Sequence, residues 1–209
     1  MARMHSVSAI QEILIPHQDR LRRVMWPVWP RYQADIAESA RLTFDATTEA
    51  NILYDLAKAN VLKEFAEVPG VFTVDEFTFY LVFDGLPAGI DGQVACRIKK
   101  MDLAGHSRNF PTELAKAVRR NSSRALELET MATIVDIGYV LHPLGIGFSR
   151  VQAIRVADEA FIFEIPREEG GAIQMPTPLH PREGQPGQKK LFEITPRKEG
   201  SPTDPKSKS

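Results

Sequence analysis

The clearest pattern along the chain is an amphipathic one in residues 45–68, where apolar side chains recur every three or four positions. This spacing predicts a helix with one apolar stripe, for which Asp45 or Thr47 is a suitable N-cap and Pro69-Gly70 a stop signal. Shorter helices are predicted before it, the first beginning at a capping box formed by Ser8 and Gln11. The apolar positions of the long stripe are Leu53, Leu56, Ala57, Val61, Phe65 and Val68.

The segment Trp26–Pro30, with the sequence WPVWP, interrupts this helical region. Each proline disfavours the helical conformation for the residue before it, so the segment is predicted to be a rigid, non-helical elbow. Trp26 and Trp29 then have two interpretations, either as apolar caps on the core or as a binding knob for a partner protein. A short helix is predicted to follow in residues 31–42.

After Gly70 the apolar positions change from a helical period to a period of two, which is typical of strands. Residues 71–85 are predicted to form one strand and residues 93–102 a second, so Phe77–Met101 is expected to be a β-hairpin. Residues 113–126 are helical by propensity. Three further strands are predicted at Ile134–Leu141, Arg150–Val156 and Ala160–Ile165.

This order of elements predicts an α+β fold in which N-terminal helices pack on a mostly antiparallel sheet. The sheet is expected to combine the hairpin with a three-stranded meander that follows the helix at 113–126. Residues 1–166 have the length and apolar content of a single domain. Residues 167–209 are rich in Pro, Gly and charged residues, a composition that predicts a disordered tail. The apolar island Lys189–Ile194 in this tail is either a docking motif or an incidental cluster.

Composition changes this picture by excluding several classes of protein. The 209 residues carry a formal net charge of −1, so the whole chain has no field that would attract nucleic acid or an anionic membrane. The single cysteine, Cys96, allows no internal disulfide. No apolar run is long enough to predict a membrane span, and no signal peptide is recognised, so a cytoplasmic location is expected. The scattered histidines predict no metal site, and no cofactor is expected.

Charge is nevertheless unevenly distributed, since residues 97–124 contain eight basic and two acidic residues. This segment begins with the motif CRIKKMDLAGHSRNFPT at residues 96–112. Four polar side chains are expected to shape the loop and cap the next helix by bonding backbone groups: Asp102, Ser107, Asn109 and Thr112. Basic side chains in the segment are candidates for binding an anionic target or a partner, and the competing interpretation is that they pair with acidic side chains elsewhere in the protein. The candidates are Arg97, Lys99, Lys100, Arg108, Arg119 and Arg120.

Two arrangements provide candidate catalytic residues. Asp84, at the end of the first predicted strand, and Lys99, in the second, have the layout of a restriction-type nuclease that holds Mg²⁺ with acidic side chains. The position two before the lysine needs an oxygen ligand, but it is Arg97, whose guanidinium would repel the metal. His106 is a candidate general acid or base for a metal-independent ribonuclease. The identity of the catalytic residues is therefore left open among Asp84, Lys99 and His106.

Several ordered pieces of the sequence resemble a family of uncharacterised proteins from bacterial chromosomes and mobile elements. The pieces are TEANILY at Thr48–Tyr54, the Arg97-x-Lys99-Lys100-Met101-Asp102 and Ser107-x-Asn109-x-Pro111-Thr112 motifs, and GYVL at Gly138–Leu141 followed by Gly145. The resemblance spans about residues 40–165. Such genes are encoded beside helix–turn–helix regulators, some of which carry a metallopeptidase-like domain.

The resemblance implies that this chain is the toxin or effector of a toxin–antitoxin or phage-defence module, and that an antitoxin-like regulator is its partner. No catalytic residue is carried over by the resemblance. The alternative function is that of a nucleic-acid-binding protein with a degenerate or active restriction-type nuclease core.

Overall fold

The computed structural model describes residues 5–75, 78–84, 92–107 and 132–168. The chain divides into one unit of residues 1–176 and a second of residues 177–209. All the described residues belong to the first unit. The helix predicted at 113–126 lies outside them, and so does the predicted tail except for its first two residues.

Helices make up the N-terminal part of the described chain. They are α1 (Val7–Leu14), the 3₁₀ helix η1 (Ile15–His17), α2 (Gln18–Met25), α3 (Val28–Asp35), α4 (Glu38–Arg41) and α5 (Ala46–Glu64). The prediction of α5 is confirmed, and the Asp45 side chain caps it by accepting from the backbone N–H groups of Thr47 and Thr48. The predicted cap of α1 was wrong, because Ser6 and not Ser8 accepts the hydrogen bond from the Ala9 N–H.

The prediction of a non-helical WPVWP segment was also wrong. The chain leaves α2 at Met25, turns through Trp26 and Pro27, and enters α3 at Val28. Pro30 therefore lies in the first turn of α3, where its missing N–H costs no intrahelical hydrogen bond. Trp26 donates its indole N–H to the Ile165 carbonyl at 3.0 Å. Trp29 is buried in the apolar core and the partly buried Trp26 packs against it, so both tryptophans have the core position that was one of the two interpretations.

Six strands form one sheet in the order β1-β2-β3-β4-β5-β6. Their bounds are β1 Val71–Asp75, β2 Phe79–Phe83, β3 Gln93–Met101, β4 Ala132–Leu141, β5 Phe148–Arg155 and β6 Ala160–Glu164. Neighbouring strands are antiparallel except β3 and β4, which are parallel. The α+β class and the mostly antiparallel sheet are thus confirmed, including the final meander. The single strand expected over residues 71–85 is instead the antiparallel pair β1 and β2.

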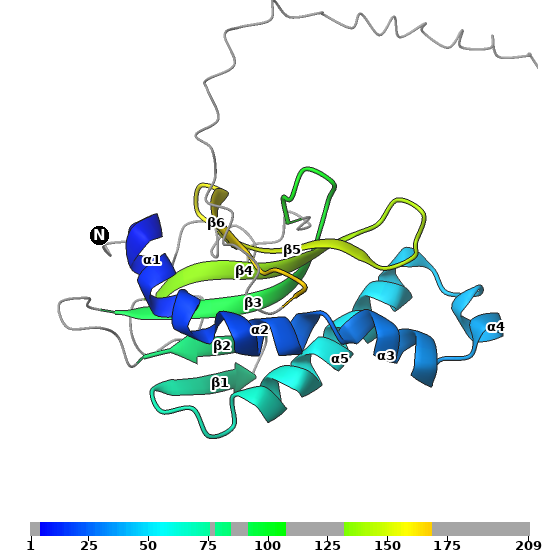
Figure 1. Cartoon of the computed structure of the whole chain (residues 1–209), viewed down its shortest axis with the longest axis horizontal. Helices are drawn as coiled ribbons and strands as arrows, with labels where there is room; N and C mark the ends of the chain where they lie inside the picture. Colours follow the sequence, from blue (N-terminus) through cyan, green and yellow to red (C-terminus); the bar gives the residue numbers. More distant parts are fainter. Residues whose placement is uncertain (1–4, 76–77, 85–91, 108–131, 169–209) are drawn as a thin grey trace, which may run out of the picture. The chain divides into compact units, whose positions relative to one another are not determined.

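The helical layer covers one face of this sheet (Figure 1). Helices α1, α2, α3 and α5 form a large apolar cluster with inward-facing side chains of β2 to β6, and Val71 of β1 packs against this cluster. The layer also closes the outer edge of β6, because three of its side chains donate to backbone carbonyls there: Gln11 to Ile162, Gln18 to Glu164 and Trp26 to Ile165. Carbonyls paired in this way cannot recruit another strand. The opposite face of the sheet carries the polar residues of the candidate site.

Candidate functional site

A buried ion pair lies at the centre of the polar face of the sheet. Arg97 of β3 and Asp136 of β4 occupy register positions next to each other in the parallel pair. The Arg97 Nε and Nη2 atoms donate to the two carboxylate oxygens of Asp136 at 2.8 and 3.0 Å. The side chains are 5% and 0% exposed, respectively, so the pair is screened from water. Bidentate geometry of this kind is among the stronger polar contacts in proteins.

This contact gives Arg97 an anion within the protein itself. For Arg97, the competing interpretation of the basic segment is therefore the one that applies: the residue pairs with an acidic side chain elsewhere in the chain. Asp136 was not singled out from the sequence, although it is the only charged residue in the apolar strand ATIVDIGYVL. A charged residue inside such a run needs a buried counter-ion, and that is the signal that would have located it.

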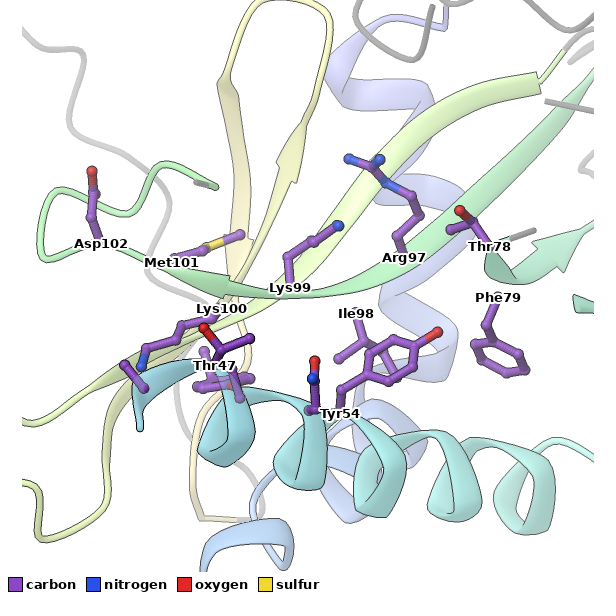
Figure 2. A pocket seen from close by; sticks show the side chains of 14 residues that line it. Thr47, Tyr54, Thr78, Phe79, Arg97, Ile98, Lys99, Lys100, Met101 and Asp102 are labelled. Atoms are coloured by element: carbon purple, nitrogen blue, oxygen red, sulfur yellow. The ribbon is translucent and has the colours of Figure 1, made fainter. Parts of the chain in front are cut away.

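Lys99 lies two residues further along β3 and therefore on the same face as Arg97. Figure 2 shows both side chains on one side of the strand, while Ile98 points to the other. Lys99 is half-buried, and burial lowers the pKa of its ammonium group. The nearby positive charge of Arg97 lowers this pKa further, and the carboxylate of Asp136 opposes part of the shift. Within the described residues, Lys99 has no ion-pair or hydrogen-bond partner. Among the described residues, the charge of Asp136 therefore attracts Lys99 without forming an ion pair with it, because the Asp136 carboxylate is already paired with Arg97.

A pocket of about 610 Å³ lies beside this side chain, and we call it the Lys99 pocket. It forms because β2 pairs with β3 only as far as Cys96, whereas β3 continues to Met101 beside the N-terminal half of α5. Figure 2 shows β3 crossing above α5, with the pocket side chains between and around them. Among the described residues the lining consists of Ala46, Thr47, Ala50, Asn51, Tyr54, Thr78, Phe79, Arg97, Ile98, Lys99, Lys100, Met101, Asp102 and Tyr139.

Lys100 points to the α5 side of β3 and lies 3.7 Å from the carboxylate of Glu49. Glu49 belongs to the first part of α5, so this ion pair joins the strand to the helix at the mouth of the Lys99 pocket. Both side chains are partly exposed, at 35% and 26%, and an ion pair of that exposure contributes little to stability. Of the three cations in the Arg97-x-Lys99-Lys100 motif, two are therefore engaged with acids.

The loop after β3 is held by its own side chains. Asp102 accepts the backbone N–H of His106 at 3.0 Å and its carbonyl accepts the N–H of Gly105 at 2.9 Å. Gly105 has a φ of +87°, and its carbonyl accepts the side-chain amide of Gln152 on β5 at 2.9 Å. Ser107 then forms a bridge with Met101. The motif DLAGHS is in this way fastened to the polar face of the sheet.

No protein-family model, curated protein or solved structure matches this chain. Its function is therefore inferred from the site. In the part of the chain that the structure describes, none of the helices is both long and apolar enough to cross a membrane. Residues 5–75, 78–84, 92–107 and 132–168 also contain no group of three or more His, Cys, Asp or Glu side chains that could hold a metal ion.

The structure does not bring Asp84 and Lys99 together. Asp84 is exposed and accepts a hydrogen bond from the Gln93 side chain at 3.0 Å, at the opposite end of the β2–β3 hairpin. Lys99 is six residues beyond Gln93 on β3, a separation of about 20 Å at the usual rise of a strand. Thr78, the residue directly before β2, lines the Lys99 pocket, but its side chain has no carboxylate. The described residues therefore lack the acidic pair of the restriction-type layout.

His106 lies outside the Lys99 pocket. Its ring is 53% exposed and is 3.7 Å from the carboxylate of Glu159 in the β5–β6 turn. Cys96 is buried, and burial raises the pKa of its thiol, so it is not a reactive nucleophile. Five of the predicted site residues lie outside the described residues: Arg108, Asn109, Thr112, Arg119 and Arg120.

Proposed function

We propose that this chain is the toxin or effector component of a toxin–antitoxin or phage-defence module, and that it acts by binding an anionic target in the Lys99 pocket. The biological setting rests on the resemblance of the motifs at residues 48–54, 97–112 and 138–145 to proteins encoded beside helix–turn–helix regulators. The binding activity rests on one observation, the half-buried ammonium group of Lys99 that faces a pocket without a counter-ion among the described residues.

The free-energy argument is that a partly desolvated cation is unfavourable until it meets an anion. Burial disfavours the charged form of Lys99, and the positive charge of Arg97 adds to this effect. A bound anion would remove both penalties and would form charge-assisted hydrogen bonds with the ammonium group. Because Asp136 already accepts from Arg97, and Glu49 is close to Lys100, the attraction would be centred on Lys99.

Growth of a bacterial host after induced expression tests the proposal. The wild-type chain, expressed without any neighbouring gene, is expected to stop growth, and Lys99→Met is expected to abolish this effect. Lys63→Met is the matched control, since Lys63 is an exposed lysine in the last turn of α5 and is not part of the Lys99 pocket. The proposal is wrong if the wild-type chain leaves growth unchanged, or if Lys99→Met is as toxic as the wild type at equal protein level.

The alternative, general binding of nucleic acid, differs in its salt dependence. A protein that neutralises several phosphates loses affinity steeply as salt rises, whereas one lysine contributes a slope of about one. Fluorescence anisotropy with labelled single-stranded RNA and double-stranded DNA, from low to high salt, separates the two. A steep slope that Lys99→Met does not change would favour the alternative, because the cations would then lie elsewhere than in the Lys99 pocket.

A further inference from the structure

The Lys99 pocket is larger and more varied than a site for a simple inorganic anion. Its volume of about 610 Å³ falls in the range of pockets that enclose an organic ligand. An anion bound by Lys99 alone would leave most of this space to water. The other residues that line the pocket therefore indicate the chemistry of the part of the ligand attached to the anionic group.

The wall contributed by α5 has a regular composition. Thr47, Asn51 and Tyr54 follow each other at four and three residues, so they lie on one face of the helix. Ala46 and Ala50, which are one turn apart beside them, have small side chains and leave room between the helix and β3. This face thus presents a hydroxyl, a primary amide and an aromatic ring to a ligand.

Three aromatic residues line the pocket, but their rings are not equally available. The Lys58 ammonium lies over the Phe79 ring, 5.3 Å from its centroid. The Tyr139 ring is stacked on Phe148, with centroids 4.5 Å apart. The half-buried Tyr54 packs against the apolar core, but within the described residues no other ring stacks on it and no cation lies over its face. Tyr54 is therefore the ring whose remaining surface can stack on a planar ligand.

We propose that the ligand of the Lys99 pocket is a nucleoside monophosphate, with its phosphate at Lys99, its base on the ring of Tyr54 and the edge of the base at the Asn51 amide. This inference rests on the proposed function, in which the pocket binds an anion, and it names the class of that anion. A phosphate satisfies the ammonium group, and a base has the π-face that stacks on an aromatic side chain. The amide of Asn51 offers both donors and an acceptor to a base edge.

Isothermal titration calorimetry with AMP, GMP, CMP and UMP tests the inference, with the four nucleosides and inorganic phosphate as separate probes. At least one nucleoside monophosphate is expected to bind, and both its nucleoside and inorganic phosphate are expected to bind more weakly by a factor of ten or more, roughly the loss of one charged or stacking contact. Lys99→Met is expected to weaken the monophosphate about tenfold or more without affecting the nucleoside. Tyr54→Leu is expected to weaken both by roughly tenfold.

Two controls make these outcomes decisive. Lys63→Met should bind as the wild type does, and the unfolding midpoint of each variant establishes that a loss of binding is not a loss of fold. The inference is overturned if no monophosphate binds at millimolar concentration, if inorganic phosphate binds as tightly as the best monophosphate, or if binding is independent of Lys99.

The inference and the proposed function can fail separately. Growth arrest that requires Lys99, together with no binding of any monophosphate, would overturn the ligand class and leave the effector function supported. Binding of a monophosphate that requires Lys99 and Tyr54, together with unchanged host growth, would support the ligand class and refute the toxic role.

Discussion

The Arg97–Asp136 pair provides the sharpest test of the structure, because both partners are almost fully buried. Asp136→Ala leaves the guanidinium of Arg97 desolvated and without its two hydrogen bonds. Removing one partner of a buried ion pair costs about 3–5 kcal/mol of unfolding free energy. For a chain of this length such a loss lowers Tm by an amount on the order of 10 °C.

The reverse substitution, Arg97→Met, leaves a buried carboxylate in place of a buried guanidinium. A carboxylate can take up a proton and become neutral, whereas a guanidinium cannot lose one in the accessible pH range. The two variants are therefore expected to be similarly destabilised at pH 7, and Arg97→Met is expected to recover part of its loss at pH 5 while Asp136→Ala does not. The combination Arg97→Met with Asp136→Ala removes both charges, so it should be much more stable than the sum of the single effects predicts.

Urea unfolding followed by the fluorescence of the buried Trp29 and the partly buried Trp26 gives the free energies for this double-mutant cycle. The slope of the free energy against urea should be unchanged in all variants, because they expose the same surface on unfolding. The reasoning is refuted if Asp136→Ala costs less than about 1 kcal/mol, or if the effects of the two substitutions simply add.

Three further predictions concern other parts of the fold. Ser6→Ala is expected to cost about 1 kcal/mol by urea unfolding, while Ser8→Ala, at the cap expected from the sequence, should be close to neutral. Burial lowers the pKa of His17. The unfolded chain therefore binds more protons than the folded one below about pH 6.5, and stability falls there. In a series of Tm measurements, His17→Phe should reduce this fall between about pH 7 and 5. Gly138→Ala should cost about 1–3 kcal/mol, because its Cβ would lie within 2.6 Å of three Met101 side-chain atoms, and a second substitution, Met101→Ala, should recover part of the loss if this clash is the cause.

The elements with a strong period were predictable from the sequence, and the misses have physical reasons. The apolar stripe of α5 and the apolar runs of β4, β5 and β6 agree with the structure within a few residues. In the sequence of residues 71–83 only Asp75 and Glu76 interrupt the apolar and β-branched positions, and no Gly, Pro or Asn marks a turn, so the pattern did not reveal that β1 and β2 are separate strands. At WPVWP, the local preference of each residue before a proline was overridden, because Pro30 occupies a first helical turn.

The site was predictable to the extent that its members are local in sequence. Arg97, Lys99 and Lys100 stand out as a cluster of charges, and their alternation along a strand places the first two on one face. What the sequence could not show is which acid each cation meets. Asp136 comes from the parallel neighbour β4 and Glu49 from α5, and both assignments depend on the register of strands and helices far apart in the chain.

That register also explains why Lys99 has no ion-pair partner among the residues that the structure describes. The β4 residue beside Arg97 is Asp136, and the β4 residue beside Lys99 is Gly138, which has no side chain to offer. The space above Gly138 is filled by Met101, since a Cβ there would clash with the Cε atom of Met101. The neighbouring strand thus neutralises one cation and, two residues later, excludes a counter-ion from the other. A lysine held half-buried in this way costs folding free energy that a surface position would not. The charge of Asp136 offsets part of this cost, and a bound anion would offset more of it.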